Sequence, residues 1–545
     1  MFKETYDVIV VGGGHAGSEA AAAAANIGSS TLLVTMSLQN IAQMSCNPAM
    51  GGIAKGQIVR EIDALGGYSG IVSDRSAIQF KMLNKSKGPA MWSPRVQSDR
   101  MRFAEEWRNL LEKTPNLDFY QEMVTGLVVS KNKVCGVKTT LGLTIKAKTV
   151  ILTNGTFLNG LIHIGDKNYG GGRAGEKSSK GLTEQLVSLG FDSGRMKTGT
   201  PPRVDGRSLD FSKMIEQPGD THPEKFSYLD LTSPLTTQRS CHMTHTSALV
   251  HDILRDGFDR SPMFNGSIKS VGPRYCPSIE DKINRFSEKE RHQLFVEPEG
   301  WNTVEVYVNG FSTSLPEDIQ FTALRSVKGF EKVKFFRPGY AIEYDYFAPT
   351  QLRYSLETKL IENLFFAGQI NGTTGYEEAA SQGLMAGINA GLKAQNKPAF
   401  VLKRNQAYIG VLIDDLITKG TEEPYRMFTS RAEYRTLLRQ DNADSRLTEM
   451  SNKIGLASDE RVIKMLDKYT KAHNLMSFLK KTSVAVSEIN PILEKNKSAL
   501  VKQSGKIDKI LSRPNIYFDD LKQIKSVDKY LVDNTLSKEV VDQAE

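Results

Sequence analysis

The first residues of the chain follow a hydrophobic pattern that predicts strand, turn, helix and strand in succession. The run Asp7-Val8-Ile9-Val10-Val11, rich in β-branched residues, is typical of a strand buried on both faces of a parallel sheet. It ends at Gly12, and an alanine-rich helical run follows from Ser18 to Ala25. The second apolar run, Ser30 to Val34, predicts the next strand. This order predicts a βαβ unit and therefore a parallel sheet.

The turn of this unit carries a GxGxxG pattern, with Gly12, Gly14 and Gly17 at the three glycine positions. The first glycine permits the tight turn, the second lets the backbone approach a pyrophosphate, and the third allows close packing of helix on strand. The pattern therefore predicts dinucleotide binding; the alternative is a plain glycine-rich turn. A carboxylate usually follows the second strand and binds the ribose. Here only Thr35 and Ser37 offer hydroxyl groups, so the choice of cofactor depends on other motifs.

Further along, the pattern predicts helices at 53–65 and 102–113, a β-meander at about 118–146 and a buried strand at 147–155. A matching strand, 363–369, leads into a helix at 380–394. The segments 1–17, 147–155 and 363–383 resemble, in order, the three FAD-contacting motifs of glutathione-reductase-like flavoproteins. This resemblance implies an α/β fold with an FAD-binding Rossmann domain, inserted domain(s) and a C-terminal all-α region.

We expect four regions along the chain. Residues 1–200 form the first part of the FAD-binding domain, and a segment rich in Pro, Gly, Ser and Thr at 201–280 forms an insert associated with the nicotinamide nucleotide. Residues 281–399 complete the FAD-binding domain, and 400–545 form a helical domain. A length of 545 residues is compatible with two to four domains.

Composition excludes several classes of protein. Four cysteines are too few and too scattered for a disulfide framework, and His242 and His245 lack a Cys or carboxylate cluster at metal-ligand spacing, so we expect no metal site. No apolar run is long enough to span a membrane, and the first strand leaves no room for a signal peptide, so we expect a cytoplasmic protein. The net charge of +8 permits an anionic partner without requiring one.

Two cysteines are candidate reactive thiols. Cys46 precedes the helix predicted at 53–65, and Cys276 precedes Pro277, a residue suited to the first turn of a helix. A helix N-terminus favours the thiolate, so we expect both thiols to be functional. The alternative for a single cysteine is a small buried hydrophobic side chain.

A cluster of arginines after residue 420 is a candidate RNA-binding surface. Arg431, Arg435 and Arg439 are spaced i, i+4 and i+8, so they would share one face of a helix. Arg426 and the aromatic side chains of Tyr425, Phe428 and Tyr434 lie nearby in the sequence, and arginine with aromatic rings suits phosphate contact and base stacking. The alternative is a solvated face paired with Glu433, Asp441 and Asp444.

Long, ordered motifs resemble one family of proteins. They are GGGHAGSEAA, MSCNPAMGGIAKG, GTFLNGLIHIG, GGRAGE, KTGTPPR, THTS, GPRYCPSIEDK, RPGYAIEYDY, FFAGQINGTTGYEEAASQG and EEPYRMFTSRAEYRTLLRQDNADSRLT. These motifs resemble the tRNA uridine 5-carboxymethylaminomethyl modification enzymes, the MnmG (GidA) family, over about residues 1–450.

The resemblance implies an activity, cofactors and partners. Family members modify C5 of the wobble uridine in tRNA together with the GTPase MnmE, and they use FAD, NADH and a one-carbon unit from 5,10-methylenetetrahydrofolate. A symmetric homodimer and a heterotetramer with MnmE are expected. The family usually runs some tens of residues further, so we expect the helical region 400–545 to be incomplete at its C-terminus, which puts binding of the GTPase in doubt.

The resemblance also assigns residues. Cys46 and Cys276 would be the catalytic thiols, one adding to C6 of uracil and the other acting as acid/base or resolving thiol. FAD contacts would be Gly12, Gly13, Gly14, His15, Ala16, Gly17, Val124, Ser179, Gly368 and Gln369. Nicotinamide-nucleotide contacts would be Gly272, Pro273, Arg274, Tyr275, Pro277, Ser278, Ile279, Glu280, Asp281, Ile283, Asn284, Arg285 and Phe286. Lys282, Arg426 and Arg435 would bind the tRNA, and the spacing described above adds Arg431 and Arg439 to the candidate RNA-binding residues.

Two other functions fit part of the pattern. One is a folate- and FAD-dependent tRNA uridine C5 methyltransferase, which shares the glycine-rich loop and paired thiols but is shorter than this chain. The other is an RNA-binding scaffold in which FAD is structural. Two thiols in electropositive settings count against the scaffold.

Overall fold

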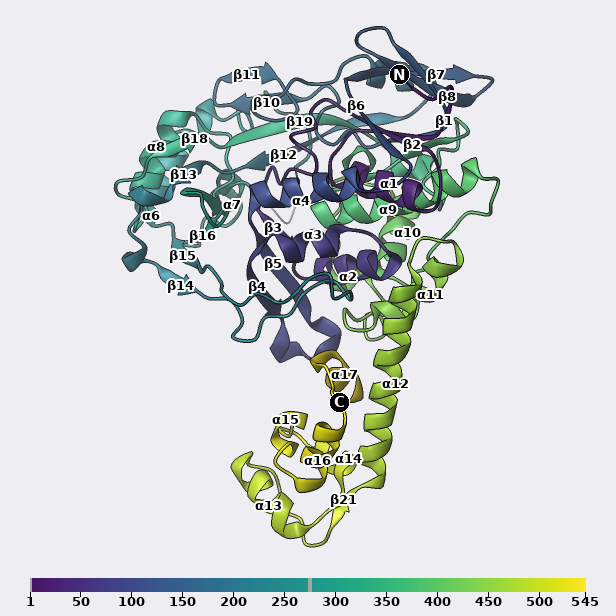
Figure 1. Ribbon diagram of the computed structural model, residues 1–545. Coiled ribbons are helices and arrows are strands. Elements are labelled where there is room, and N and C mark those ends of the chain that lie inside the picture. Colours follow the sequence, from purple (N-terminus) through teal and green to yellow (C-terminus); the bar gives the residue numbers. More distant parts are fainter. Residues whose placement is uncertain (1, 273–276) are drawn as a thin grey trace. The chain divides into compact units, whose positions relative to one another are not determined.

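The chain forms two compact units, Met1–Leu456 and Ala457–Glu545, in a computed structural model that describes residues 2–272 and 277–545 (Figure 1). The first unit is built on a sheet with the strand order β6-β2-β1-β9-β8-β7, and β20 also pairs with β9. The pairs β6-β2, β2-β1, β1-β9 and β9-β20 are parallel, whereas β9-β8 and β8-β7 are antiparallel. The bounds are β1 (Tyr6–Val11), β2 (Thr31–Thr35), β6 (Leu117–Gln121), β7 (Val124–Ser130), β8 (Lys133–Thr139), β9 (Thr144–Leu152) and β20 (Leu364–Phe366).

Strand β9 joins two regions that the sequence pattern separates. We expected a meander ending near residue 146 and a distinct buried strand from 147. Residues 144–146 pair with β8, and residues 147–152 of the same strand pair with β1. The first predicted meander strand, at 118–120, lies within β6, which pairs with β2 in the parallel part of the sheet. The meander therefore consists of β7, β8 and the start of β9.

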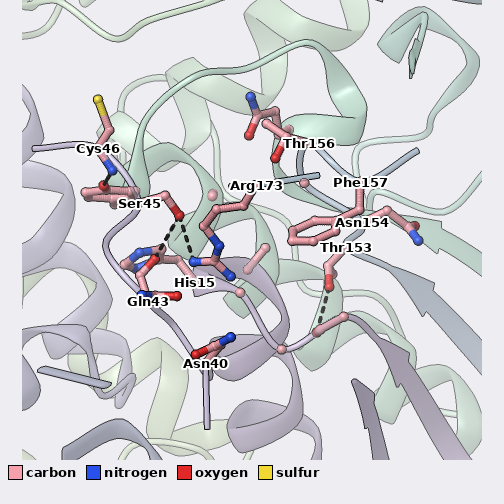
Figure 2. Close-up of a pocket in the computed structure, with 18 of the residues that line it drawn as sticks. His15, Asn40, Gln43, Ser45, Cys46, Thr153, Asn154, Thr156, Phe157 and Arg173 are labelled. Atoms are coloured by element: carbon pink, nitrogen blue, oxygen red, sulfur yellow. Dashed lines mark hydrogen bonds between the residues drawn. The ribbon is translucent and has the colours of Figure 1, made fainter. Parts of the chain in front are cut away.

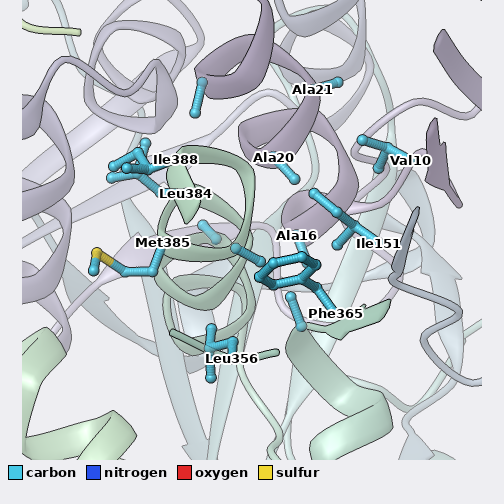
Figure 3. Close-up of a cluster of buried hydrophobic side chains, with 14 of the residues drawn as sticks. Val10, Ala16, Ala20, Ala21, Ile151, Leu356, Phe365, Leu384, Met385 and Ile388 are labelled. Carbon is cyan, nitrogen blue, oxygen red and sulfur yellow. The ribbon is translucent and has the colours of Figure 1, made fainter. Parts of the chain in front are cut away.

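Helices α1 (His15–Asn26) and α9 (Tyr376–Ala394) pack against each other beside this sheet (Figure 3). Small side chains make the approach possible: a Cβ atom at Gly383 would overlap the carbonyl of Ala16, and one at Gly387 would overlap that of Ala20. Ala16 and Ala20 lie between α9 and the sheet residues Val10, Ile151 and Phe365 in the same buried cluster. The alanine run of α1 thus lets two N-terminal helix ends lie close to the edge of one sheet.

The first unit contains further, smaller sheets. One is β3-β5-β4, with β3 (Ala49–Gly51), β4 (Ala77–Leu83) and β5 (Ser93–Ser98). A second is β11-β10-β19-β12, with β10 (Leu161–Ile164), β11 (Lys167–Gly170), β12 (Ser193–Thr200) and β19 (Tyr340–Phe347). A third is β14-β15-β16-β17-β13-β18, with β13 (Arg203–Asp205), β14 (Ile215–Gln217), β15 (Cys241–His245), β16 (Gln293–Pro298), β17 (Glu305–Asn309) and β18 (Phe335–Arg337).

The third of these sheets changes the expected limits of the insert. We placed its end near residue 280, but β16, β17 and β18 belong to the same sheet as β13. A separate hydrophobic core, with buried residues from Val204 to Val333, supports this sheet. The inserted lobe therefore runs from 203 to 337. The expected boundary followed the end of the Pro- and Gly-rich composition, and composition marks loops rather than sheet membership.

The remaining helices of the first unit lie between these strands in sequence. They are α2 (Lys55–Leu65), α3 (Ser69–Arg75), α4 (Arg100–Glu112), α5 (Leu182–Ser188), α6 (Ala248–Arg255), α7 (Ile279–Arg285), α8 (Glu317–Arg325), α10 (Tyr408–Lys419) and α11 (Ala443–Lys453). Helices α10 and α11 pack against α2 within the first unit. We expected the helical domain to begin at about residue 400, whereas the separate helical unit begins at Ala457.

The second unit is mainly helical, with its own hydrophobic core between Leu475 and Val527. Its elements are α12 (Asp459–Lys481), β21 (Ser483–Val484), α13 (Val486–Lys495), β22 (Gly505–Lys506), α14 (Ile507–Leu511), α15 (Phe518–Leu521), α16 (Lys525–Asp533) and α17 (Lys538–Ala544). Across the described residues of both units, none of the helices has the length and apolar character that a membrane crossing requires. The same residues contain no group of three or more His, Cys, Asp or Glu side chains able to hold a metal ion.

Candidate active site

The turn between β1 and α1 opens on a cavity of about 390 Å³ (Figure 2). Its lining includes the glycine-rich turn, residues within 34–49, the turn at 153–157 after β9, and the start of α9. Because β1 and β9 are adjacent parallel strands, their carboxyl ends meet at this edge of the sheet. The crevice outside the carboxyl ends of the strands is where open α/β sheets bind their ligands.

The glycine-rich turn has the geometry that its sequence predicts. Gly12 has a φ of +103°, in the region that favours glycine. A Cβ atom at Gly17 would overlap the carbonyl oxygen of Gly12, whereas one at Gly14 would meet nothing within 4 Å. Gly14 is the N-cap of α1, so the N–H groups of the first helical turn face open space in the cavity. This arrangement suits a pyrophosphate bound at the helix N-terminus.

His15, inside the motif, is buried and neutral. Its ring stacks on that of Tyr376 with 4.3 Å between centroids. Burial, with a smaller effect from the charge of Arg173, lowers the pKa of His15 to about 3. Neither ring nitrogen has a hydrogen-bond partner among the described residues. One nitrogen of the neutral ring is therefore available to donate and the other to accept a hydrogen bond from a ligand.

Other buried polar atoms along the cavity also lack a partner among the described residues. They are Gln43 Oε1, Asn47 Oδ1, Asn154 Oδ1 and Thr374 Oγ1. Buried polar groups in native proteins are nearly always hydrogen-bonded. A long polar ligand would satisfy them, so the residues present fit FAD. Of the FAD contacts implied by the sequence, the cavity is lined by Gly12, Gly13, Gly14, His15, Ala16, Val124, Ser179 and Gln369, whereas Gly17 and Gly368 are not among its lining residues.

The carboxylate that is missing after β2 has a counterpart on the neighbouring strand. Glu122 follows β6, which pairs with β2, and its N–H donates to the carbonyl of Thr35 over 3.0 Å. Both residues line the cavity, together with Ser37. The sequence does not reveal Glu122, because the ribose-binding acid usually follows β2 itself and the pairing of β6 with β2 is visible only in the fold.

Cys46 lies on the same cavity, in the loop before β3. Its N–H donates to the phenolic oxygen of Tyr376 over 2.6 Å, and its sulfur lies 3.0 Å from the phenolic oxygen of Tyr307. Arg173 donates to the hydroxyl of the preceding residue, Ser45, over 2.9 Å (Figure 2). These contacts fix the loop between the dinucleotide turn and the inserted lobe.

The positive charge near Cys46 comes from a side chain and not from a helix end. We expected the thiol just before the helix predicted at 53–65, but β3 intervenes and α2 begins at Lys55. Arg203, which is 1% exposed, instead donates to the carbonyl of Ser45 over 3.0 Å and to that of Cys46 over 3.4 Å. Burial alone would lower the pKa of Arg203, but Glu299, followed by Tyr307 and Cys46, raises it, so the guanidinium stays charged.

The segment 277–286 lies in the inserted lobe. Ser278 is the N-cap of α7, so Pro277 precedes the helix and is not in its first turn. Ile279 and Ile283 are buried in the core of this lobe, and Glu280 accepts hydrogen bonds from Thr313 and Ser314, so these predicted nicotinamide contacts have structural partners. Gly272, Pro277, Asp281 and Arg285 line a second cavity with Lys197, while Asn284 and Phe286 are exposed. Cys276, Pro273, Arg274 and Tyr275 lie outside the described residues.

The arginines predicted to share a helix face do not lie on a helix. Residues 429–431 form one 3₁₀ turn, and turns and bends follow to residue 440. Tertiary contacts hold the segment: Arg404 forms ion pairs with Glu433, Asp414 and Asp415, and Arg431 donates to the carbonyl of Arg426. Spacing alone predicted a helix because it does not reveal such contacts.

The predicted RNA-binding residues therefore have different surroundings. Arg435 is exposed, and Arg426 lines the cavity. Arg439 pairs with Asp441 through two hydrogen bonds of 3.0 Å, and the Arg431 guanidinium lies 4.2 Å from the ring centroid of Tyr425. Lys282 donates to the carbonyl of Gly310 over 2.9 Å in the inserted lobe.

Comparison with known proteins identifies the family. The family model of glucose inhibited division protein A (GidA) matches residues 7–398, and the model of the tRNA modifying enzyme MnmG/GidA C-terminal helical domain matches residues 459–545. The chain belongs to the MnmG/GidA family. This confirms the resemblance found in the sequence.

Relatives in the MnmG/GidA family match nearly the whole chain. The tRNA uridine 5-carboxymethylaminomethyl modification enzyme MnmG of Flavobacterium johnsoniae is 75% identical over 544 residues, covering 100% of this chain and 87% of its own length. The enzyme of the same name from Porphyromonas gingivalis is 56% identical, covering 99% and 87%. The crystal structure of Aquifex aeolicus GidA (form II) matches with a TM-score of 0.89 at 45% identity, covering 99% and 86%. This structural match confirms the expected fold class.

Proposed function

We propose that this chain is an FAD-dependent enzyme that modifies C5 of the wobble uridine of tRNA, adding a carboxymethylaminomethyl or aminomethyl group. The observation that carries the proposal is the position of Cys46, whose thiol lies on the same cavity as the dinucleotide turn. The names of the relatives supply the substrate class. NADH as reductant, 5,10-methylenetetrahydrofolate as carbon donor, the GTPase MnmE as partner and a homodimeric state are parts of the same proposal.

The residues present would hold FAD as follows. The N–H groups at the start of α1 would bind the pyrophosphate, and Glu122 and Ser37 would bind the ribose hydroxyls. Val124, Ser179 and Gln369 would contact the rest of the cofactor. FAD, when bound, supplies a redox-active ring. The orphaned polar atoms of His15, Gln43, Asn47, Asn154 and Thr374 support this placement because a polar ligand would complete their hydrogen bonding.

A thiolate is the side chain suited to activate C5 of uracil. Addition of sulfur to C6 forms the C6–S bond and moves the C5–C6 π electrons toward C5 and the C4 carbonyl, which makes C5 nucleophilic. After C5 has bonded to the incoming carbon, loss of the C5 proton and cleavage of the C6–S bond return the thiolate. The charged guanidinium of Arg203 near Cys46 favours the thiolate that this step requires. Cys276 remains the second candidate thiol.

For tRNA, we propose contacts from the arginine-rich segment that begins at Arg426. Arg426 lines the cavity and Arg435 is exposed, so they are the first candidates for phosphate contact. Arg431, Arg439 and Lys282 are further candidates; in this structure they donate hydrogen bonds to Arg426, Asp441 and Gly310, respectively.

Anaerobic stopped-flow absorbance with NADH tests the proposal on the wild type, Cys46→Ser and Cys276→Ser. We expect the flavin absorbance to bleach in all three proteins, and only the wild type to modify tRNA when the GTPase and the folate are present. Mass spectrometry of tRNA nucleosides separates an aminomethyl adduct from the methyl group that a C5 methyltransferase would add. A wild-type flavin that NADH never reduces would overturn the redox proposal and favour an RNA-binding scaffold.

A further inference from the structure

A tyrosine of the inserted lobe contacts the sulfur of Cys46. The phenolic oxygen of Tyr307 lies 3.0 Å from Cys46 Sγ, although the two residues are 261 positions apart. Tyr307 is in β17 and is 3% exposed. No sequence motif singled out this residue, because its relation to Cys46 arises only when the inserted lobe closes against the loop before β3.

Tyr307 lies between two strands of the inserted lobe, and an arginine packs on its ring. In the sheet it lies opposite Arg203 of β13 and opposite Glu297 of β16. The guanidinium of Arg203 lies 4.5 Å from the ring centroid and pairs with Glu299 over 2.6 Å. Glu297 pairs with Arg95 over 2.9 Å. The guanidinium over the ring and the position of Tyr307 between two neighbouring strands restrict the movement of its hydroxyl.

A second neighbour of the sulfur, the carbonyl of Gly199, favours the protonated thiol over the thiolate. The carbonyl oxygen of Gly199 lies 3.9 Å from Cys46 Sγ, and it can only accept a hydrogen bond, so it interacts favourably with the thiol alone. The Tyr307 hydroxyl can donate a hydrogen bond to the thiol or to the thiolate, and the bond to the charged thiolate is the stronger of the two. The balance at this sulfur between thiol and thiolate therefore depends on Tyr307.

We propose that Tyr307 is a positioning residue that donates its hydroxyl hydrogen bond to Cys46 and so increases the fraction of Cys46 present as thiolate. The phenol keeps its proton, and the thiol proton leaves to solvent. This inference rests on the proposed use of Cys46 as a reactive thiol. Titratable and charged groups around the pair include Arg203, Glu299, Glu297, Arg95, Tyr376 and Glu377, and each has a protein partner. Arg203 and Glu299 also interact with Arg100, Arg337 and Glu305.

Alkylation of Cys46 by iodoacetamide, measured by peptide mass spectrometry across pH 5 to 10 on the FAD-loaded protein, tests the inference. The thiolate is the form that reacts. Tyr307→Phe removes the donor and keeps the ring. Because a hydrogen bond to a charged group is worth about 1.5–3 kcal/mol, we expect the midpoint of the Cys46 profile to rise by about one to two pH units.

The same chain provides controls for the alkylation experiment. Tyr408→Phe is the matched control, because Tyr408 is also fully buried and its hydroxyl has no partner among the described residues. Cys135, on β8, is the internal reference and should keep its profile in every variant. Cys241 is buried, and burial raises its pKa to about 12, so any alkylation of Cys241 below pH 9 would reveal a variant that has lost its fold.

A second substitution keeps the test decisive if Tyr307→Phe disturbs the fold. 3-Fluorotyrosine at position 307 preserves the size of the ring and is a stronger donor, so the Cys46 midpoint should fall. A midpoint within about half a pH unit of the wild type in folded Tyr307→Phe, or a midpoint that does not fall with 3-fluorotyrosine, would overturn the inference. Failure of the wild type to modify tRNA would instead overturn the proposed function and leave the alkylation profiles unaffected.

Discussion

The N–H of Cys46 donates a hydrogen bond to the phenolic oxygen of Tyr376, which lies at the start of α9. The ring of Tyr376 also stacks on His15 of the glycine-rich turn. Burial raises the pKa of Tyr376 well above its usual value, so the phenol stays protonated. One side chain therefore touches both the dinucleotide turn and the thiol loop.

Replacing Tyr376 by Phe should loosen the thiol loop and leave the dinucleotide turn in place. The variant keeps the stack on His15 but leaves the Cys46 N–H without its acceptor, at a cost of about 1–3 kcal/mol. We expect faster hydrogen exchange in residues 43–50, lower tRNA modification and normal FAD content. Tyr408→Phe is the control, and unchanged exchange in 43–50 would show that the contact does not hold the loop.

Two glycines of one motif should respond differently to alanine. Gly17→Ala would overlap the carbonyl of Gly12, so we expect loss of FAD and a decrease of more than about 4 kcal/mol in the free energy of unfolding. Gly14→Ala meets no protein atom within 4 Å but enters the space assigned to the pyrophosphate. It should retain the melting temperature of the FAD-free protein and lose FAD. Normal flavin absorbance in Gly14→Ala would contradict this placement of the pyrophosphate.

Glu122 should contribute to FAD affinity through the ribose. Glu122→Gln keeps the size of the side chain but removes its charge, and we expect weaker FAD binding by roughly tenfold, equivalent to about 1.4 kcal/mol. Glu176, which also lines the cavity but pairs with Arg173, provides a comparison as Glu176→Gln. Titration of the FAD-free protein with FAD measures both. Equal FAD affinities for the wild type and Glu122→Gln would contradict a role for Glu122 and favour Thr35 and Ser37 as the groups that bind the ribose.

The free energy of unfolding should decrease as pH rises from 5 to 7, because of Glu19. This residue is fully buried in α1, and burial raises its pKa to about 7, although Ser69 and Tyr68 donate hydrogen bonds to it. Between the ordinary pKa of a glutamate and pH 7, the Glu19 carboxyl is therefore protonated in the folded state and ionised in the unfolded state. The stabilisation is complete below that ordinary pKa and is lost as pH rises through 7, by about 3 kcal/mol in total.

Melting temperatures of the wild type and Glu19→Gln across this range measure the effect. The glutamine should reduce the slope without removing it, because burial also raises the pKa of Asp74 to about 6 and gives a contribution of the same sign. Identical slopes in the two proteins would mean that Glu19 is ionised in the folded state throughout.

Arg435 and Arg439 should differ in their effect on tRNA binding. Arg435 is exposed, so Arg435→Ala should weaken binding and reduce the slope of log affinity against log salt by about one. Arg439 already pairs with Asp441, so Arg439→Ala should have a smaller effect on that slope. Filter binding at several salt concentrations measures both, and equal slopes for Arg435→Ala and the wild type would remove Arg435 from the interface.

The local parts of this fold could be predicted from sequence, and the pairings between distant segments could not. The run of β1, the glycines of the turn and the strand at β20 carry their own signals, because strand burial and turn geometry act within a few residues. The end of the inserted lobe, the pairing of β6 with β2 and the contact of Tyr307 with Cys46 depend on which segments meet in space. The spacing of Arg431, Arg435 and Arg439 predicted a helix wrongly for the same reason. Arg404, which is distant in sequence, forms an ion pair with Glu433 of that segment.

The pairing of β9 with β20 has a consequence for synthesis of the chain. The parallel sheet begins at residue 6, yet its strand β20 ends at residue 366, and α9, which covers α1, ends at residue 394. At about 5–20 residues per second, a ribosome needs on the order of 20–80 s to reach that point. During this interval one edge of β9 and the apolar face of α1 have no native partner. The dinucleotide-binding sheet is thus among the first parts to be translated, but it becomes complete only after about 390 residues have been made, so its apolar surfaces stay exposed throughout that interval.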